Sequence, residues 1–347
     1  MIAAVKRPSV DGDAHCRSAV RRRRFAVNLW IDPKEKLIPP MDTPPAQKTF
    51  VITGATSGIG LAAARQLARI GATVIGIGRS PERCRSCEQS LRALNPAGKA
   101  FCLRADLSLQ SEVSDAAERV RERLAAAPSQ RLDGLLNNAG GFSFRLTLTP
   151  EGFERTWALN HLAPYLLTRE LLPLLQAAPS ARIVTVSSGS HYRSRLNWND
   201  LQSRRCYNGL RAYGRSKFAN VLFTHELNRR LGEQSGVQAF AADPGLVRTH
   251  IGAKGTPALV RWVWALRSAG GITPEKAAEG IVRLLLDPDV DRKRGIYWKH
   301  GRPADPDPAA RDGKSARRLW EISERMCALT PQEEHRLPLS QRMLGEG

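Results

Sequence analysis

Short runs of β-branched and aliphatic residues alternate with longer stretches of helical period from residue 49 onwards. Short apolar runs bounded by turn residues are typical of strands, and longer runs with apolar residues three or four positions apart are typical of helices. Strands are therefore expected at residues 49–53, 73–77, 100–104, 134–137, 182–187, 237–242 and 295–298. Helices are expected near residues 59–70, 82–94, 110–126, 151–177 and 212–232.

The regular alternation of strand and helix determines the fold class. A helix between successive strands makes the strands parallel, and right-handed crossovers place helices on both sides of the sheet. The sequence therefore predicts an α/β protein with a single doubly wound parallel sheet, a Rossmann fold with helices on both faces. Residues 47–330 are expected to form this domain, between a flexible extension at 1–46 and a tail at 331–347. One hypothesis is that the natural start of the chain is Met41, with an organellar presequence upstream as the alternative; the sequence leaves open whether residues 1–40 belong to the natural protein.

The first expected strand runs directly into the sequence TGATSGIG at residues 53–60, and an alanine-rich helix follows. Glycines allow a tight turn and let backbone N–H groups approach a pyrophosphate, and the helix N-terminus adds a favourable dipole. The turn therefore predicts a dinucleotide-binding site, although glycine turns without a ligand also occur. The residues expected to surround the pyrophosphate are Gly54, Thr56, Ser57, Gly58, Ile59 and Gly60.

Arg79 follows the second expected strand, 19 residues after Gly60. NAD-binding versions of this unit carry an acidic residue at about this place, which accepts hydrogen bonds from the ribose hydroxyls. An arginine cannot accept those bonds but pairs well with a 2′-phosphate, so the sequence favours NADP(H) over NAD(H). The alternative is an arginine that only faces solvent.

Tyr213 and Lys217 are four residues apart in the last expected helix, so both point to the same face of it. An ammonium group beside a phenol lowers the phenol pKa, which makes Tyr213 a candidate proton donor and acceptor. A tyrosine–lysine pair of this spacing is by itself more often a surface feature. Its assignment as catalytic depends on the surrounding motifs, which are Asn137-Asn138-Ala139-Gly140, Asn160, Ser187-Ser188 and Asp243-Pro244-Gly245.

Together with the glycine turn, these motifs in this order resemble the short-chain dehydrogenase/reductase family over residues 49–330. The resemblance implies an NADP(H)-dependent oxidoreductase that interconverts an alcohol and an aldehyde or ketone, with Tyr213 as general acid/base. It also implies that Ser188 hydrogen-bonds the reacting oxygen, that Lys217 holds the nicotinamide ribose and that Asn160 supports a proton-relay water. Further cofactor contacts that it implies are Asp106 and Leu107 at the adenine, Asn137, Ala139 and Gly140 along the cofactor, and Pro244, Gly245 and Thr249 at the nicotinamide end.

The branch of the family is indicated by two further stretches. The 25-residue interval from Ser188 to Tyr213 and the sequence RRLWEISE at 317–324 resemble the retinol-dehydrogenase-like and WW-domain-oxidoreductase-like branch. Tryptophan and aliphatic residues among basic ones at 259–267 are expected to form a helical lid over a lipophilic substrate. An ordinary packed helix and weak membrane-surface contact are the alternatives for this segment.

Composition limits the other classes of function. The formal net charge of +20 raises nucleic acid as a partner, but the arginines are dispersed and no nucleic-acid-binding motif is present, so nucleic-acid binding is not expected. No apolar run approaches the roughly 18 residues of a membrane span. Six irregularly spaced cysteines favour a reducing cytoplasm and suggest no metal site.

Two questions stay open at this stage. The alternative function is a catalytically idle NADP(H)-binding regulator or scaffold, against which the intact set of Asn160, Ser188, Tyr213 and Lys217 argues. The sequence leaves open whether the chain forms a homo-oligomer, and it does not identify the small-molecule carbonyl or alcohol substrate.

Overall fold

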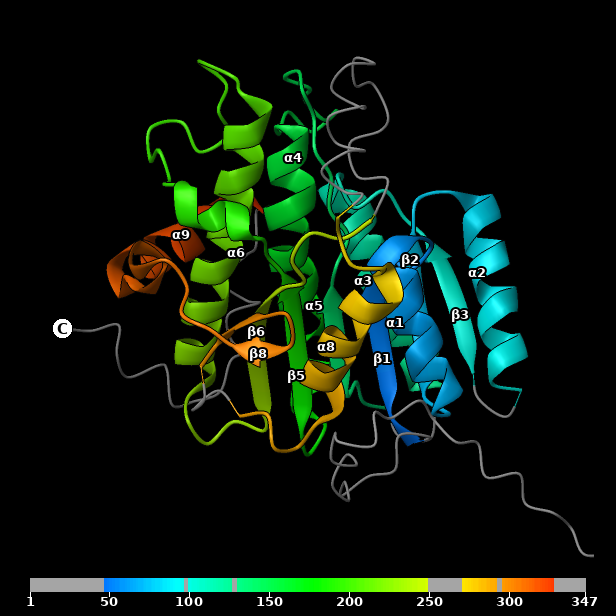
Figure 1. The fold of residues 1–347 in the computed structure, drawn as a ribbon. Helices are drawn as coiled ribbons and strands as arrows, with labels where there is room; N and C mark the ends of the chain where they lie inside the picture. Colours follow the sequence, from blue (N-terminus) through cyan, green and yellow to red (C-terminus); the bar gives the residue numbers. More distant parts are fainter. Residues whose placement is uncertain (1–46, 97–98, 127–129, 249–269, 292–294, 328–347) are drawn as a thin grey trace, which may run out of the picture. The chain divides into compact units, whose positions relative to one another are not determined.

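An eight-stranded sheet forms the centre of the structure, with the strand order β3-β2-β1-β4-β5-β6-β7-β8 (Figure 1). The computed structural model describes residues 47–96, 99–126, 130–248, 270–291 and 295–327, all within one compact unit. Strands β1 to β7 run parallel, and β8 pairs antiparallel with β7. The strands are β1 (Thr49–Thr53), β2 (Thr73–Gly78), β3 (Ala100–Arg104), β4 (Gly134–Asn137), β5 (Ala181–Val186), β6 (Val237–Asp243), β7 (Tyr297–Lys299) and β8 (Arg302–Pro303).

The strand order reverses between β1 and β4. The chain runs outwards from β1 through β2 to β3, returns to place β4 beside β1, and continues outwards through β5, β6 and β7. In sheets of this kind, the carboxyl ends of the strands on either side of the reversal flank a binding crevice. The predicted α/β fold with one doubly wound parallel sheet is confirmed.

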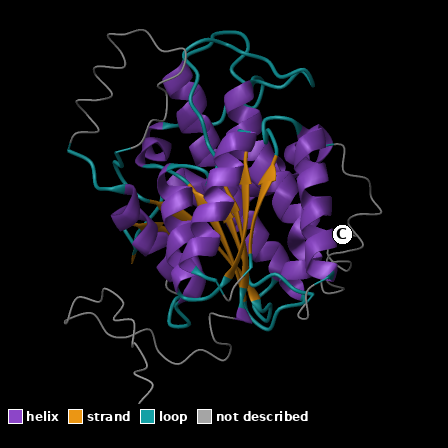
Figure 2. Cartoon of the chain, turned by 90° about the vertical axis from the view of Figure 1, so that its right-hand side faces the viewer, coloured by secondary structure: helices purple, strands orange, loops and turns teal. Residues whose placement is uncertain are grey.

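Helices cover both faces of the sheet (Figure 2). Buried side chains of α3, α5 and α6 share one core cluster with the strands, and those of α1, α2 and α8 share the other. The helices are α1 (Gly58–Arg69), α2 (Pro81–Leu94), α3 (Gln110–Ala125), α4 (Arg155–Trp157), α5 (Ala163–Gln176), α6 (Gly209–Leu231), α8 (Pro274–Leu286) and α9 (Gly313–Met326). Shorter helical turns are the π-helical η2 (Ala158–Leu162) and the 3-10 turns η3 (Gly189–Arg193) and η5 (Pro308–Arg311).

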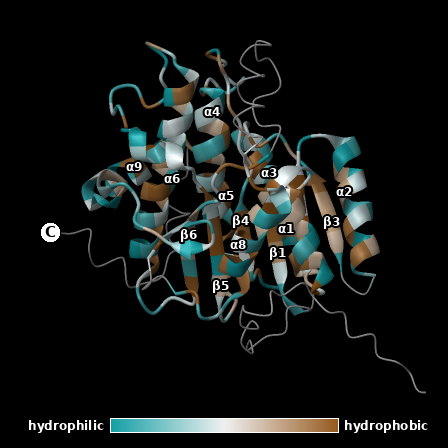
Figure 3. Ribbon diagram, viewed as in Figure 1, coloured by the Kyte–Doolittle hydropathy of each residue, from teal (hydrophilic) through white to brown (hydrophobic). Residues whose placement is uncertain are grey.

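Side chains alternate between the two faces along each strand. In β1, Val51 belongs to the cluster with α3 and α5, whereas Phe50 and Ile52 belong to the cluster with α1 and α8. All five residues of β1 are buried, as is typical of a parallel strand covered on both sides. Figure 3 shows that α1 and α2 each carry hydrophobic and hydrophilic patches, which fits helices with one face on the sheet.

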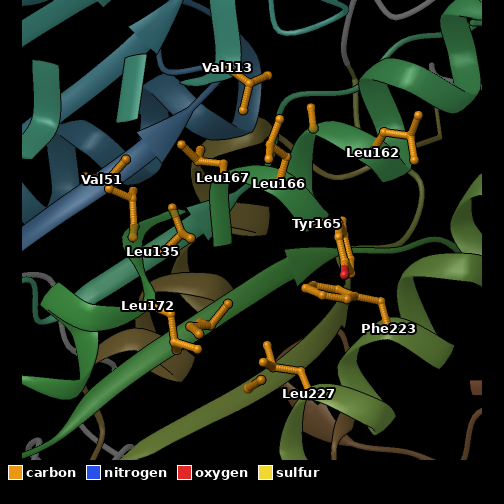
Figure 4. Packing of buried hydrophobic residues seen from close by; sticks show 14 of the residues in the cluster. Val51, Val113, Leu135, Leu162, Tyr165, Leu166, Leu167, Leu172, Phe223 and Leu227 are labelled. Atoms are coloured by element: carbon orange, nitrogen blue, oxygen red, sulfur yellow. The ribbon is translucent and has the colours of Figure 1, made fainter. Parts of the chain in front are cut away.

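Aromatic residues from three distant parts of the chain meet in the core on the α5–α6 side. Tyr165 of α5 and Phe223 of α6 lie edge to face, with ring centroids 5.7 Å apart (Figure 4). Trp320 of α9 packs on both, at 5.0 Å from Tyr165 and 5.8 Å from Phe223. Such ring pairs stabilise a fold by about 0.5–1.5 kcal/mol each beyond the burial of their area. The C-terminal helix is therefore part of the core.

The first six strands lie within one residue of the bounds predicted from sequence, and the seventh begins two residues later than predicted. The helix expected at 151–177 begins at Arg155 and is interrupted by the π turn η2. Helices α8 and α9 were not predicted. Residues 1–46, 331–347 and the expected lid at 259–267 lie outside the described residues. Among the helices that the structure describes, none is long and apolar enough to cross a membrane.

Gly60, in the first turn of α1, provides a test of the packing between this turn and β4. A Cβ atom added at Gly60 would lie 2.3 Å from the Gly54 carbonyl oxygen and 2.5 Å from Nδ2 of Asn138. We expect Gly60→Ala to lower the free energy of unfolding by about 1–3 kcal/mol, because overpacking against backbone outweighs the better helix propensity of alanine. Urea denaturation followed by circular dichroism measures this change.

Gly270→Ala is the matched control, because a Cβ there would meet no atom of the described residues within 4 Å. Equal urea midpoints for the two variants would show that the close packing at Gly60 costs nothing.

Candidate active site

The polar residues singled out from the sequence follow the carboxyl ends of four strands. The glycine turn follows β1, Asn138 and Ala139 follow β4, Ser188 follows β5, and Asp243 ends β6. Because β1, β4, β5 and β6 are adjacent and parallel, their carboxyl ends meet at one edge of the sheet. The candidate site is built on this edge.

The glycine turn leaves the start of α1 open to an anion. Gly54 and Gly58 have φ angles of 67° and 54°, a region that favours glycine. The Gly54 N–H donates to the Ile77 carbonyl oxygen at 2.8 Å, which ties the turn to β2. In this part of the described chain, Ser57 makes no side-chain capping bond to α1, and the first turn of α1 has no acidic residue. Free N–H groups at a helix N-terminus are what a phosphate group requires.

A cavity of about 1310 Å³ begins at this turn and carries a marked excess of positive charge. The described residues that line it include five arginines but only one acidic residue, Asp106. Such a cavity suits a polyanionic dinucleotide. Of the predicted cofactor residues, those that line it are Gly54, Thr56, Ser57, Gly58, Ile59, Arg79, Asp106, Leu107, Ala139 and Gly140. Further lining residues include Arg83, Asn138, Phe142, Phe144, Arg145, Arg155, Leu159 and Arg248.

Arg79 lies in the cavity wall beside Asp106. An Nη atom of Arg79 and one of Arg155 each lie 3.8 Å from the same oxygen, Oδ2 of Asp106. The other oxygen of Asp106 accepts hydrogen bonds from the backbone N–H and the hydroxyl of Ser108. These ion pairs are long and partly exposed, so they contribute little stability and leave the guanidinium donors free to bind a ligand.

Asn160 lies in the π turn η2, a type of turn that often occurs at functional sites. Its Oδ1 accepts from the Gly141 N–H at 2.8 Å, and its Nδ2 donates to the Gly141 carbonyl oxygen at 3.0 Å. Nδ2 also donates to Oγ of Ser216 at 3.0 Å, and that hydroxyl donates to the carbonyl oxygen of Tyr213. The fully buried Asn160 amide therefore joins the segment after β4 to α6.

Lys217 of α6 is a buried cation, with 3% of its surface exposed. Its Nζ donates to the Val186 carbonyl oxygen at the end of β5, at 2.8 Å. Burial lowers the pKa of Lys217 to about 8, and the negative charge of Asp243 opposes this shift. A Cβ added at Gly140 would lie 3.5 Å from Nζ and 3.4 Å from Oδ1 of Asn160, so these polar groups converge on one point of the backbone.

Tyr213 is half-buried one helical turn before Lys217. Burial raises the pKa of Tyr213 to about 12; a hydrogen bond with Ser188 lowers it, and the charge of Asp243 raises it. The lowering of this pKa expected from Lys217 is not found. Nζ of Lys217 lies 5.7 Å from the centroid of the Tyr213 ring and donates to the Val186 carbonyl oxygen.

The two serines after β5 have different partners. Ser187 is buried, and its hydroxyl donates to the Lys217 carbonyl oxygen at 2.9 Å. Interaction with Ser188 lowers the pKa of the Tyr213 phenol, and Oγ of Ser188 accepts from the Ser190 N–H at 3.3 Å, which caps η3. Ser188 is therefore the serine that faces Tyr213.

The remaining predicted residues lie less directly on the cavity. Asn137 is buried with its Nδ2 donating to Oγ1 of Thr168 at 2.9 Å, and the neighbouring Asn138 lines the cavity in its place. Gly60 packs closely against the backbone of Gly54 in the glycine turn. Pro244 and Gly245 follow β6, and Gly245 has a φ angle of 79°. Thr249 lies outside the described residues.

Three residues complete the site but were not selected from the sequence. The buried carboxylate of Asp243 accepts from the Gly245 N–H at 2.9 Å and from the Tyr297 hydroxyl at 3.1 Å. Ser216 connects Asn160 to α6, and the ring of Phe142 lies 6.1 Å from that of Tyr213. Of these, only Asp243 could have been found from the sequence, since it opens the Asp243-Pro244-Gly245 motif.

No cluster of histidine, cysteine and carboxylate side chains among the described residues could hold a metal ion.

Comparison with known proteins agrees with this geometry. A family model described as short chain dehydrogenase matches residues 48–258. The chain is 40% identical over 291 residues to retinol dehydrogenase 14 of Mus musculus, a match that covers 81% of this chain and 86% of the mouse protein.

Solved structures give the same result. A protein from Mycobacterium paratuberculosis superposes with a TM-score of 0.63 at 34% identity, over 81% of this chain and 94% of that one. The angucycline C-6 ketoreductase LanV with bound NADP superposes with a TM-score of 0.58 at 25% identity, over 74% of this chain and 95% of that one. The chain therefore belongs to the short-chain dehydrogenase family, in its retinol-dehydrogenase-like branch, and is an oxidoreductase.

Proposed function

We propose that the protein transfers a hydride between NADP(H) and a lipophilic alcohol or carbonyl compound, with Tyr213 as the general acid/base. The observation that carries this proposal is that the start of α6, with Tyr213 and the buried Lys217, is tied by hydrogen bonds to the end of β5, which Ser188 follows, and to the buried Asn160. The proposal adds the choice of NADP(H), the lipophilic substrate and the roles of these residues to the family assignment.

The residues around the glycine turn fit a dinucleotide. The turn and the start of α1 would bind the pyrophosphate, because they offer N–H donors, a helix dipole and no competing carboxylate. Arg79 would bind the 2′-phosphate, since its side chain is 53% exposed and lies in the cavity wall. Lys217 would donate to the nicotinamide ribose. The bound cofactor supplies the hydride donor or acceptor, and the protein supplies position and proton transfer.

Proton transfer is assigned to the Tyr213 hydroxyl. With a pKa near 12, the phenol is protonated at neutral pH, so it can donate to the oxygen of a carbonyl as that oxygen gains negative charge. The Ser188 hydroxyl would donate a second hydrogen bond to the same oxygen. The positive charge of Lys217 would stabilise the phenolate that remains after the proton leaves. Asn160 would hold a relay water through the backbone that it fixes.

A lipophilic substrate is supported by apolar groups near Tyr213. Phe142 lies against Phe144, with ring centroids 4.6 Å apart, and both line the cavity. Among the described residues, the large hydrophobic side chains that stand exposed are Leu146, Leu148, Leu210 and Leu246. They lie in the segment after Phe144, in the first turn of α6 and just after β6, all of which adjoin the candidate site. The names of the relatives, a retinol dehydrogenase and an angucycline ketoreductase, also point to large apolar substrates.

The catalytically idle alternative is not favoured. A protein that only bound NADP(H) would need the glycine turn and Arg79, but it would have no use for a serine hydroxyl near a phenol beside a buried ammonium. Burial of Lys217 and Asp243 is costly, and such groups are concentrated at active sites.

Tyr213→Phe tests the proton donor. The variant keeps the ring and its packing, so we expect kcat for carbonyl reduction to fall by roughly 10²–10⁴-fold while NADPH affinity stays close to that of the parent. Lys217→Ala should impair both cofactor affinity and kcat, because the ammonium serves the ribose and the phenol. Turnover of Tyr213→Phe at the parental rate would exclude the mechanism.

Arg79→Asp tests cofactor choice. It removes an attraction for the 2′-phosphate and adds a repulsion, so we expect the ratio of kcat/KM for NADPH over NADH to fall by one or more orders of magnitude, or to reverse. Arg145→Asp changes the charge of the same cavity elsewhere and controls for a general electrostatic effect. If both variants changed the ratio equally, Arg79 would not be the residue that reads the phosphate.

Asp243→Asn tests the charge beneath the site. The carboxylate raises the pKa of both Lys217 and Tyr213, so its removal should lower both. Carbonyl reduction requires both groups protonated, and we therefore expect the alkaline limb of the pH–rate profile to move to lower pH. Tyr297→Phe removes a hydrogen bond to Asp243 but keeps the charge, so it should leave that limb in place. An alkaline limb unmoved in Asp243→Asn would contradict this assignment.

A further inference from the structure

Two buried histidines lie close to the proposed catalytic residues. His161 directly follows Asn160 in the π turn, and His191 lies three residues after Ser188 in η3. Their side chains are 1% and 0% exposed. Neither residue has a role in the proton transfer proposed above.

His191 bridges two backbone groups from distant parts of the chain. One ring nitrogen, Nδ1, lies 2.8 Å from the Ser188 carbonyl oxygen, and the other, Nε2, accepts from the Asp307 N–H at 3.1 Å. A carbonyl oxygen can only accept and an N–H can only donate, so the imidazole must be neutral with its proton on Nδ1. His191 therefore joins the backbone of Ser188 to Asp307, the residue that caps η5.

His161, the chain neighbour of Asn160 in the π turn, contacts α9. Its Nε2 lies 2.9 Å from Oγ of Ser323 in α9, and that hydroxyl donates its own proton to the Leu319 carbonyl oxygen at 2.8 Å. Nε2 must therefore carry the proton and donate it to Ser323. Burial lowers the pKa of His161 to about 4, so this ring too is neutral near pH 7.

We infer that His191 and His161 are positioning residues, which in their neutral forms hold Ser188 and Asn160 in place against the C-terminal segment 307–323. The inference rests on the proposed function, because it takes Ser188 and Asn160 as catalytic. A displacement of about 1 Å of a catalytic group can cost roughly 10²-fold in rate. Histidine suits this task because the neutral ring can donate and accept at the same time from fixed positions.

The groups around His191 determine how the link responds to pH. The carboxylates of Asp243 and Asp307 favour the protonated ring, and Lys299 opposes it; burial outweighs the carboxylates and lowers the pKa of His191. The rings of Tyr192 and Tyr297 cover the imidazole, with centroids 4.0 and 4.9 Å from it. Protonation at Nε2 would set an N–H against the Asp307 N–H and break the link. Acid should therefore reduce kcat.

The test compares His191→Leu with His191→Gln in the full-length protein. A glutamine amide can donate to the Ser188 carbonyl and accept from the Asp307 N–H, whereas leucine can do neither. We expect His191→Leu to lower kcat by about 10–100-fold with KM and NADPH affinity little changed, and His191→Gln to recover most of the loss. The acid limb of kcat should weaken in His191→Gln, because an amide does not titrate.

Tyr192→Phe is the matched control. It keeps the ring on His191 and removes only the hydroxyl bond to the Asp305 carbonyl oxygen, so kcat should stay near the parental value. Ser323→Ala removes the acceptor of His161 with little change in shape and should lower kcat several-fold, so the inference remains testable if His191→Leu does not fold. Parental kcat in both His191→Leu and Ser323→Ala would overturn the inference.

Tyr213→Phe, assayed in parallel, separates this inference from the proposed function. If Tyr213→Phe is inactive and His191→Leu is fully active, only the positioning role fails. If Tyr213→Phe is fully active, the proposed function fails first. A loss of NADPH affinity in His191→Leu as large as its loss of kcat would also count against positioning, because it would indicate general damage to the fold.

Discussion

The structure depends on one constraint of parallel sheets: every strand delivers its carboxyl end to the same edge. Backbone carbonyl groups at that edge have no further strand to pair with, and buried carbonyl groups need a donor. Here side chains supply the donors. Lys217 donates to the Val186 carbonyl oxygen at the end of β5. Asn160 accepts from the N–H and donates to the carbonyl oxygen of Gly141, after β4. Lys217 and Asn160, which are proposed to take part in the reaction, thus also complete the hydrogen bonding of the backbone at this edge of the sheet.

The same burial explains the electrostatics of the site. A buried ammonium and a buried carboxylate each lose hydration, and Asp243 and Lys217 compensate each other only in part, because the pKa of Lys217 is still lowered. Tyr213 experiences the same low-dielectric surroundings and stays protonated. In the proposed reaction, the buried cation and the neutral phenol form a ground state from which the phenol gives its proton to a developing alkoxide.

Sequence reasoning succeeded where local chemistry decides the structure. The strands could be located because runs of β-branched residues between turn residues are typical of strands. The glycine turn could be located because the positive φ angles at Gly54 and Gly58 favour glycine. Helix α8 was missed, although the cap at Thr273 and the following Pro274 are visible in the sequence. The π turn at Asn160 could not be predicted, because the local pattern continues as an α-helix and the bonds of Asn160 to Gly141, 19 residues earlier, are not visible in it.

Long-range contacts also explain the errors within the site. Spacing puts Tyr213 and Lys217 on one face of α6, but it cannot show that Nζ of Lys217 is drawn to Val186 in another element. The sequence cannot show which of Asn137 and Asn138 lines the cavity. That depends on which side-chain amide is buried, and Thr168 accepts a hydrogen bond from the amide of Asn137.

The contribution of α9 to the core has a consequence for biosynthesis. Translation completes the glycine turn, the sheet strands through β6 and all of α6 before the ribosome reaches Trp320 and Ser323. The nascent chain can therefore form its nucleotide-binding portion early, but the packing on Tyr165 and Phe223 has to wait for the final residues of the domain. A message cut short before residue 305 would encode a polypeptide with a dinucleotide turn and an open aromatic face, a product that cellular quality control would recognise as unfinished.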